Sequence, residues 1–389
     1  ACGDGNLLNI KTFKIAETPE VTVKKIKDGV FVLQNDQLRV RVDRGCITSL
    51  YDRLAEREVI PEGGKANQFV IFDDKPLYWQ AWDVEVFHLD SRKVLSSGAT
   101  KVVQNDAHQV SVMTETKISE RSWVKTYISL SAAFKGQQSY VEMHSEVEWR
   151  EDKKFLKVEF PVDVRNTEAS YETQFGIVRR PTHYNTTWDM AKFEVCCHKF
   201  ADLSEHGYGV SILNDSKYGF ATCGNLMRLS LLRAPKAPDA HADMGRHNIR
   251  WAILPHQGDL GSTTVRTAFN FNNPLKLVQA PETLDASAFS SPIKLTGNKS
   301  LVLDTVKRGE DDEDVSRGEL MKRKGKSVIL RIYESLGGMS KGTIETTLDI
   351  KKVWKTNILE DDGELVKFEK GKADITLKPF EVATFRLQL

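Results

Sequence analysis

The stretch VEMHSEVEWREDKKFLKVEF (141–160) decides the fold, because apolar and polar side chains alternate along both of its halves. The apolar set is Val141, Met143, Val147, Trp149, Leu156, Val158 and Phe160, and the polar set is Glu142, His144, Glu146, Glu148, Lys157 and Glu159. A period of two places the two sets on opposite faces of a strand. The stretch therefore predicts β-strands that each have one apolar face.

The same alternation recurs along most of the chain. Further strands are predicted at 30–34, 38–43, 108–116, 123–131, 208–213 and 250–254. A sustained helical period is nearly absent, and turns such as KDG, DRG and NDSKYG separate the strands. Strands at roughly 8–12-residue spacing are typical of antiparallel sandwiches. The predicted fold class is all-β.

One composition shift divides the chain. After FNFNNPLKL (269–277) comes QAPETLDASAFSSP, which is rich in Pro, Ser and Ala and predicts a linker. We expect an upstream segment at 1–20, a large β domain at 21–275, a linker at 276–290 and a small β-sandwich at 291–389. The charge-mixed stretch GEDDEDVSRGELMKRKGK (309–326) is predicted to be a flexible surface loop.

Composition excludes several classes of function. The 389 residues carry 55 Lys and Arg against 54 Asp and Glu, so nothing predicts a nucleic-acid or anionic-membrane partner. No apolar run is long enough to span a bilayer, and ACGDGNLLNIKTF lacks the pattern of a signal peptide. The five irregularly spaced cysteines favour reduced thiols over disulfides or structural zinc. Because Met is missing at position 1, we expect a processed product or the later part of a longer chain.

The row Glu142, Glu146 and Glu148 with His144 could supply paired carboxylates, but any half-exposed antiparallel strand shows the same pattern. We interpret the row as a solvated face. Motifs for dinucleotides, phosphates, a serine nucleophile or a zinc protease are absent from the sequence.

Two other stretches bring aromatic and acidic residues together. IFDDKPLYWQAWDVEVFHLDSRK (71–93) carries Asp73, Asp74, Trp79, Trp82 and Asp83, and RRPTHYNTTWDMAKFEV (179–195) carries His183, Asn185, Trp188 and Asp189. Ring faces and carboxylates suit the two sides of a sugar. Packing of the rings in a core, with Asp and Asn holding turns, explains the same residues equally well. Both interpretations stay open here.

The stretch LLRAPKAPDAHADMGRH (231–247) follows a strand-like LMRLS and is broken by two prolines. His241, Asp243 and His247 could ligate a metal, but their spacing has no known specificity. We therefore predict no metal site and no catalytic residue on this chain. A loop that presents Asp, Arg and His towards another part of the protein is the favoured interpretation.

The three stretches 71–93, 179–195 and 231–247, together with FLKVEFPVDVR (155–165) and DLSEHGYGVSILNDSKYGF (202–220), carry a resemblance to a known family. In their order along the chain they resemble the C-terminal half of α-mannosidases of glycoside hydrolase family 38. The closest likeness is to the cytosolic and vacuolar branch, and DDKPLYWQAWDVEV favours its fungal vacuolar members. The resemblance implies a galactose-mutarotase-like supersandwich followed by a small C-terminal β-sandwich. It also implies retaining hydrolysis of terminal α-mannose residues of free oligosaccharides or N-glycans.

The family places its zinc ligands and nucleophilic aspartate upstream of this region. Zinc is thus expected for the complete enzyme, with an N-terminal catalytic portion as partner, and the chain alone is expected to be inactive. The resemblance further implies mannose-containing oligosaccharides as ligands, a homo-oligomer, and the vacuole or cytoplasm as location.

Our site hypothesis is that two loops form one wall of the substrate pocket, where their side chains bind sugar hydroxyls or hold the interface with the upstream portion. The expected substrate-binding residues are Asp73, Asp74, Trp79, Asp83, Asp243, Arg246 and His247. In the alternative, the chain is a non-catalytic carbohydrate-binding or oligomerisation module.

Overall fold

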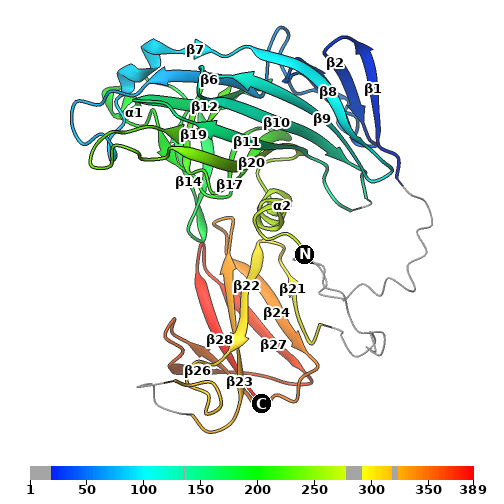
Figure 1. The fold of residues 1–389 in the computed structure, drawn as a ribbon. Coiled ribbons are helices and arrows are strands. Elements are labelled where there is room, and N and C mark those ends of the chain that lie inside the picture. Colours follow the sequence, from blue (N-terminus) through cyan, green and yellow to red (C-terminus); the bar gives the residue numbers. More distant parts are fainter. Residues whose placement is uncertain (1–18, 135, 277–290, 318–322) are drawn as a thin grey trace. The chain divides into compact units, whose positions relative to one another are not determined.

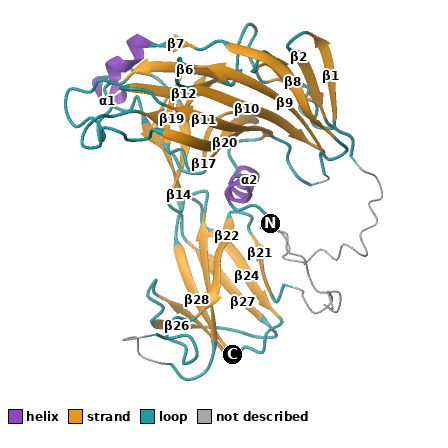
Figure 2. Ribbon diagram, viewed as in Figure 1, coloured by secondary structure: helices purple, strands orange, loops and turns teal. Residues whose placement is uncertain are grey.

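The computed structural model describes residues 19–134, 136–276, 291–317 and 323–389. It contains two compact units. The larger unit consists of Ala16–Thr173 and Val178–Asn272, and the C-terminal unit of Gln174–Ile177 and Asn273–Leu389. The expected upstream segment 1–20 and the linker 276–290 lie almost entirely outside the described residues. Strands make up most of both units (Figure 2).

The predicted class, all-β with a large supersandwich followed by a small sandwich, is confirmed. The larger unit holds three antiparallel sheets (Figure 1). The first sheet has the order β1 (Thr22–Lys27), β2 (Val30–Gln34), β3 (Leu38–Asp43), β4 (Cys46–Asp52) and β5 (Arg57–Glu58). The second has the order β14 (Gly176–Pro181), β13 (Glu168–Thr173), β16 (Phe200–Glu205), β17 (Tyr208–Asp215), β20 (Gly245–Gln257), β11 (Val141–Trp149), β10 (Trp123–Ser131), β9 (Gln109–Lys117) and β8 (Ser97–Asn105). The third has the order β15 (Val195–Cys196), β18 (Gly219–Cys223), β19 (Leu226–Arg233), β12 (Lys154–Pro161), β6 (Gln68–Asp73) and β7 (Lys93–Val94).

The three sheets share one apolar core, as the period-two pattern requires. Val40 of β3, Ile128 of β10 and Val158 of β12 are fully buried members of it. On β11 the apolar set is buried and the polar set is only partly exposed, so the predicted alternation is confirmed there. Trp251 of β20 packs edge-on against Phe69, and its indole nitrogen donates to Asn67 at 3.1 Å.

Helices are few and short. The larger unit carries the 3-10 helix η2 (Val86–Ser91) and the α-helices α1 (Thr187–Met190) and α2 (Ser262–Asn272). Phe271 of α2 packs under the guanidinium of Arg250 on β20, at 4.5 Å, so α2 lies against the outer face of the nine-stranded sheet. Within the described residues, no helix is both long enough and apolar enough to cross a membrane.

The outer face of the six-stranded sheet is covered by chain rather than by water. Both faces of β12 are buried, including Lys157 and Glu159. The segment 74–92 lies over this face, because His88 of η2 contacts the rings of Phe72 and Phe155. The segment 183–194 joins it through Phe193, whose ring is 5.9 Å from that of His88. These covering segments are two of the three stretches singled out in the sequence.

The C-terminal unit is a sandwich of two antiparallel sheets around its own core (Figure 1). One sheet has the order β21 (Ile293–Gly297), β24 (Ser340–Thr346) and β27 (Lys372–Leu377). The other has the order β22 (Leu301–Arg308), β23 (Ser327–Glu334), β28 (Val382–Gln388), β25 (Lys352–Thr356) and β26 (Asp362–Val366).

The predicted surface loop 309–326 begins with a segment that is anchored to the sandwich. Asp312 is fully buried and accepts hydrogen bonds from the backbone and the hydroxyl of Ser327, at 2.7 and 2.6 Å. Asp311 pairs with the buried Arg386 of β28 at 2.8 Å. Residues 318–322 of the predicted loop lie outside the described residues.

Candidate functional site

The candidate stretches 71–93 and 231–247 leave the six-stranded sheet at the same end. Strand β12 lies between β6 and β19, and Lys154 at its beginning pairs in register with Asp73, the last residue of β6. The next residue, Phe155, pairs with Arg233, the last residue of β19. Because β12 runs antiparallel to both neighbours, the chain leaves β6 and β19 side by side. Sheet register therefore brings the segments after Asp73 and Arg233 together.

Arg233 joins the two segments directly. Its guanidinium makes a two-pronged ion pair with Asp74, at 2.7 and 3.0 Å. It also donates to the carbonyl oxygens of Gln80 and Asp83, at 2.9 and 2.6 Å. The backbone nitrogen of Lys236 donates to the side chain of Gln80 at 3.1 Å. A fork of this kind fixes both distance and orientation. We call residues 74–83, held in this way, the anchored loop.

The structure gives the predicted residues of the anchored loop different surroundings. Asp74 is buried and its carboxylate is occupied by Arg233. Asp73 pairs with Lys154 and Lys75, and the hydrogen bond from Lys154 is the main cause that lowers the pKa of Asp73. Trp79 is 70% exposed, and Asp83 is exposed while its carbonyl binds Arg233. Of these four residues, Trp79 and Asp83 are thus the exposed ones, whereas Asp73 is partly exposed and ion-paired and Asp74 is buried.

The second predicted loop is shorter than expected. Arg246 and His247 were predicted on the loop, and that prediction is wrong, because both lie at the beginning of β20. They pair in register with Glu148 and Val147 of β11 and so point to opposite faces of the sheet. Arg246 approaches Glu148 at 3.3 Å.

Asp243 belongs to the irregular segment between β19 and β20, and its backbone has a φ of +59°. Its carbonyl lies 2.7 Å from the Nε2 atom of His247, which holds the end of the loop against the strand. No hydrogen bond or ion pair among the described residues joins the anchored loop to Asp243, Arg246 or His247. The contact between the two segments lies at Arg233 and Lys236 instead.

The candidate stretch 179–195 contains α1. The hydroxyl of Thr186 accepts a hydrogen bond from the backbone nitrogen of Asp189, and the carboxylate of Asp189 accepts one from the backbone nitrogen of Thr186. This capping box pairs backbone N–H groups at the start of the helix. His183 lies 3.6 Å from Asp189. Trp188 is 81% exposed. Asp189 thus has a structural role in the turn, whereas Trp188 is open to a partner.

Sequence reasoning did not find the charged layer beneath these segments. Lys157 is fully buried, pairs with Glu194 and lies 4.1 Å from the ring of Phe155. Burial is the main cause that lowers the pKa of Lys157. Beside this pair, Glu159 binds both Arg92 and Arg228. The sequence carries no signal of this burial, because Lys157 and Glu159 alternate with apolar residues as they would on a half-exposed strand.

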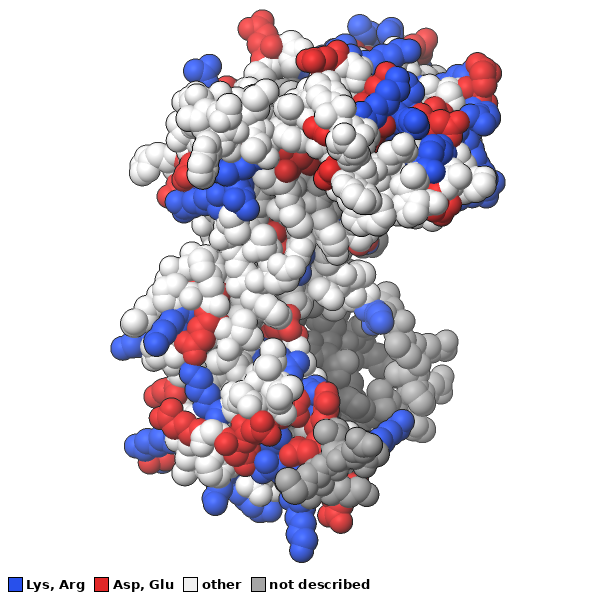
Figure 3. Space-filling model, turned by 90° about the vertical axis from the view of Figure 1, so that its left-hand side faces the viewer, with Lys and Arg blue, Asp and Glu red and all other residues white. Residues whose placement is uncertain are grey.

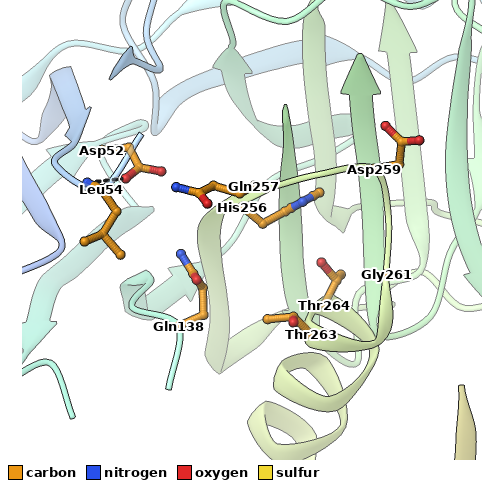
Figure 4. Close-up of a pocket in the computed structure, with 9 residues that line it drawn as sticks. All are labelled: Asp52, Leu54, Gln138, His256, Gln257, Asp259, Gly261, Thr263 and Thr264. Atoms are coloured by element: carbon orange, nitrogen blue, oxygen red, sulfur yellow. Dashed lines mark hydrogen bonds between the residues drawn. The ribbon is translucent and has the colours of Figure 1, made fainter. Parts of the chain in front are cut away.

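A separate polar pocket of 230 Å³ lies near the beginning of α2 (Figure 4). Its lining comprises Asp52, Leu54, Gln138, His256, Gln257, Asp259, Gly261, Thr263 and Thr264. His256 is buried and its ring is oriented by Asp202 at 2.8 Å, which also accepts from Ser204 and Ser211. None of these residues is a candidate from the sequence.

Comparison with known proteins adds to this geometry. Residues 33–241 match the family "Glycosyl hydrolases family 38 C-terminal domain", and residues 300–385 match "Glycosyl hydrolases family 38 C-terminal beta sandwich domain". An alpha-mannosidase of Saccharomyces cerevisiae is 48% identical in an alignment 380 residues long, which covers 92% of this chain and 35% of that protein. Alpha-mannosidase 2C1 of Homo sapiens is 39% identical over 95% of this chain and 34% of that protein.

The fold has a relative among solved structures as well. An alpha-mannosidase of Enterococcus faecalis superposes with a TM-score of 0.69 at 12% identity, over 92% of this chain and 42% of that one. The chain spans about a third of the length of the curated relatives it matches. From these matches, the chain belongs to glycoside hydrolase family 38, of which it represents the C-terminal β region.

Proposed function

We propose that this chain is the C-terminal β portion of a retaining α-mannosidase, which hydrolyses terminal α-mannose residues of free oligosaccharides or N-glycans. In this proposal the anchored loop and the segment 234–244 form one wall of the substrate pocket, and an N-terminal catalytic portion completes it. The observation that carries the proposal is the bonding of Arg233 to Asp74 and to the carbonyls of Gln80 and Asp83. These bonds join the anchored loop to the end of β19, from which the segment 234–244 continues.

The chemistry on this chain is binding rather than bond cleavage. A retaining glycosidase needs a nucleophilic carboxylate and an acid/base carboxyl group about 5–5.5 Å apart. Asp74 is neutralised by Arg233, and the lowered pKa of Asp73 keeps that group ionised at neutral pH, so neither suits a proton donor. The exposed carboxylates of Asp83 and Asp243 can accept hydrogen bonds from sugar hydroxyls. We assign both catalytic carboxylates to the N-terminal portion.

Zinc is expected for the complete enzyme and would hold mannose hydroxyls there. In the part of the chain that the structure describes, no group of three or more His, Cys, Asp or Glu side chains is arranged to hold a metal ion. His247, at the beginning of β20, is bonded through its Nε2 atom to the backbone carbonyl of Asp243. We therefore assign no step of the reaction to a metal held by this chain.

Asp243 provides the test of the pocket wall. Asp243→Asn in the complete enzyme removes the charge, while Asn tolerates the positive φ that the position requires. Asn keeps a neutral oxygen that still accepts, so the hydrogen bond from a substrate hydroxyl loses only the part of its strength that the charge supplies. That part is about 1–1.5 kcal/mol, so kcat/KM for a mannoside should fall by roughly 5- to 10-fold.

Asp28→Asn is the matched control, because it makes the same charge change on the turn between β1 and β2. It should leave kcat/KM within about twofold. If Asp243→Asn behaves like this control in a folded enzyme, Asp243 is not part of the pocket.

The other expectations from the sequence remain predictions. They are assembly into a homo-oligomer and location in the vacuole or cytoplasm. The alternative function, a non-catalytic carbohydrate-binding or oligomerisation module, requires that the chain purify without a catalytic partner and without any effect on mannoside turnover.

A further inference from the structure

The anchored loop exposes an unusual amount of aromatic surface. Tyr78, Trp79 and Trp82 are 74%, 70% and 68% exposed, and the neighbouring Leu77 is 71% exposed. Contiguous exposed apolar surface on a protein commonly marks a place where something binds. Figure 3 views the larger unit from the side on which α1 lies in Figure 1, and much of that face carries neither acidic nor basic side chains.

The two indoles are arranged as a corner. The ring centroids of Trp79 and Trp82 are 6.1 Å apart and the ring planes make an angle of 86°. The backbone nitrogens of Trp82 and Asp83 both donate to the carbonyl of Trp79, at 2.7 and 2.9 Å, and so close the turn between the rings. We call this pair of rings the tryptophan corner.

The backbone beneath the corner is held in an unfavourable conformation. Trp79 has a φ of +54°, a region that bulky residues rarely adopt. Such a conformation persists only where the surrounding structure enforces it, and it is concentrated at functional sites. Here Arg233 enforces it, because its bonds to Asp74 and to the carbonyls of Gln80 and Asp83 fix the loop on both sides of Trp79.

We propose that the tryptophan corner binds a pyranose ring of the substrate and that Arg233 is its positioning residue. This inference rests on the proposed function, in which the anchored loop is part of the pocket wall. A pyranose has an apolar C–H face that packs on an indole and a rim of hydroxyls that need polar partners. The exposed carboxylate of Asp83, next to the corner in sequence, supplies such a partner.

A sugar suits this surface better than a protein partner does. The two indoles pack edge to face and both are largely exposed, so they offer indole surface of the size of a single small ring. The loop is fixed before anything binds, which lowers the ordering cost of binding. The similar proteins from Saccharomyces cerevisiae and Homo sapiens are alpha-mannosidases by name, so the expected pyranose is mannose.

The first experiment measures binding of methyl α-mannoside and of an α-linked mannobiose to the 389-residue chain by saturation-transfer NMR. Trp82→Ala should weaken mannobiose binding at least tenfold, while Trp82→Phe should restore most of it. Trp79→Asn, chosen because Asn tolerates the positive φ, should have the same effect as Trp82→Ala. Trp354→Ala is the matched control, since it removes a partly exposed indole on β25 of the C-terminal unit, outside every candidate stretch.

The second experiment tests Arg233 with Arg233→Lys, which keeps the charge but loses the fork. The amides of Trp82 and Asp83 should exchange hydrogen at least tenfold faster, and mannobiose binding should weaken several-fold. In the complete enzyme KM for an oligomannoside should rise with little change in kcat. Gln80→Ala, which removes only the contact with the nitrogen of Lys236, gives a milder variant should Arg233→Lys fail to fold.

The outcomes separate the two proposals. Undiminished mannobiose binding by folded Trp82→Ala, or an absence of mannoside binding to the wild-type chain, overturns the tryptophan corner. If Trp82→Ala abolishes mannobiose binding by the 389-residue chain but leaves KM of the complete enzyme unchanged, the corner is a sugar site that lies outside the substrate pocket. Unchanged amide exchange in Arg233→Lys overturns the role of Arg233.

Discussion

At the scale of single residues, partners decide what a candidate side chain can do. Asp73 and Asp74 are neighbours in the sequence, yet one is ion-paired at the surface and the other is buried under Arg233. Arg233 lies within the stretch 231–247 that attracted interest in the sequence, but nothing in the sequence indicates that it reaches back to Asp74. A two-pronged bond across 159 positions depends on strand register, which residue types alone do not specify.

His88 makes the stability of the larger unit depend on pH. Its ring lies among Phe72, Phe155 and Phe193, and burial, followed by the charge of Lys157, lowers its pKa to about 4. Between pH 6.5 and 4 the unfolded chain therefore binds a proton that the folded chain does not. The contribution of His88 is fully present above pH 6.5 and is lost as the pH falls towards 4, up to roughly 3 kcal/mol.

His88→Phe should remove that dependence, because a phenyl ring suits the aromatic surroundings and does not titrate. Urea unfolding at several pH values between 4 and 7 measures it. His206→Phe, at an exposed position, is the matched control and should keep the wild-type slope. A wild-type slope in His88→Phe would show that other groups cause the acid sensitivity.

At the scale of elements, the alternation of apolar and polar residues predicted the strands well and their surroundings less well. Strands β11 and β12 both alternate in sequence, and on β11 the polar side chains are partly exposed. On β12 they are buried beneath the segments that follow β6 and precede β15. Periodicity reports which residues share a face. It does not report what covers that face, because the covering chain comes from elsewhere in the sequence.

The insertion after β22 shows the same limit. A mixture of opposite charges suggested a solvated loop, but Arg386 of β28 joins Asp311 and Asp312 of the insertion to acidic residues elsewhere in the unit. Its guanidinium binds Asp311 at 2.8 Å, Asp362 at 3.3 Å and the carbonyl of Glu360 at 2.8 Å. A buried arginine needs such partners, since an unpaired charge in the interior is unfavourable.

Arg386→Met should therefore destabilise the C-terminal unit by about 3–5 kcal/mol, because the clustered carboxylates would lose their shared cation. Thermal and urea unfolding followed in this unit measure the effect. Lys326→Met, at a side chain that is 63% exposed, is the control and should change stability by less than about 1 kcal/mol. Equal stability of the two variants would mean that the network adds nothing beyond the packing of β28.

At the scale of the whole molecule, the chain is one part of a larger enzyme in our proposal. This chain and the upstream portion of the enzyme, produced as separate polypeptides, should associate and restore hydrolysis of an aryl α-mannoside. Neither polypeptide should show that activity alone. Native mass spectrometry and a chromogenic assay on the mixture measure both effects. Stable association without activity would restrict this chain to an assembly role, and activity of the upstream portion alone would remove it from the pocket.

The sequence by itself determined the all-β class, the positions of most strands and the membership of family 38. Each of these depends on local alternation or on ordered motifs along the chain. It also indicated that the stretches 71–93 and 231–247 matter, but it placed Arg246 and His247 on a loop that ends before them.

Only the tertiary structure decided how those stretches meet. The register of β12 with β6 and β19 brings Asp73 and Arg233 to the same end of the sheet. The bonds of Arg233 then hold the loop on which Trp79 and Trp82 are exposed. The physical reason is that a bond between residues far apart in the sequence forms only when the strands between them pair in one register, and that register is a property of the whole sheet.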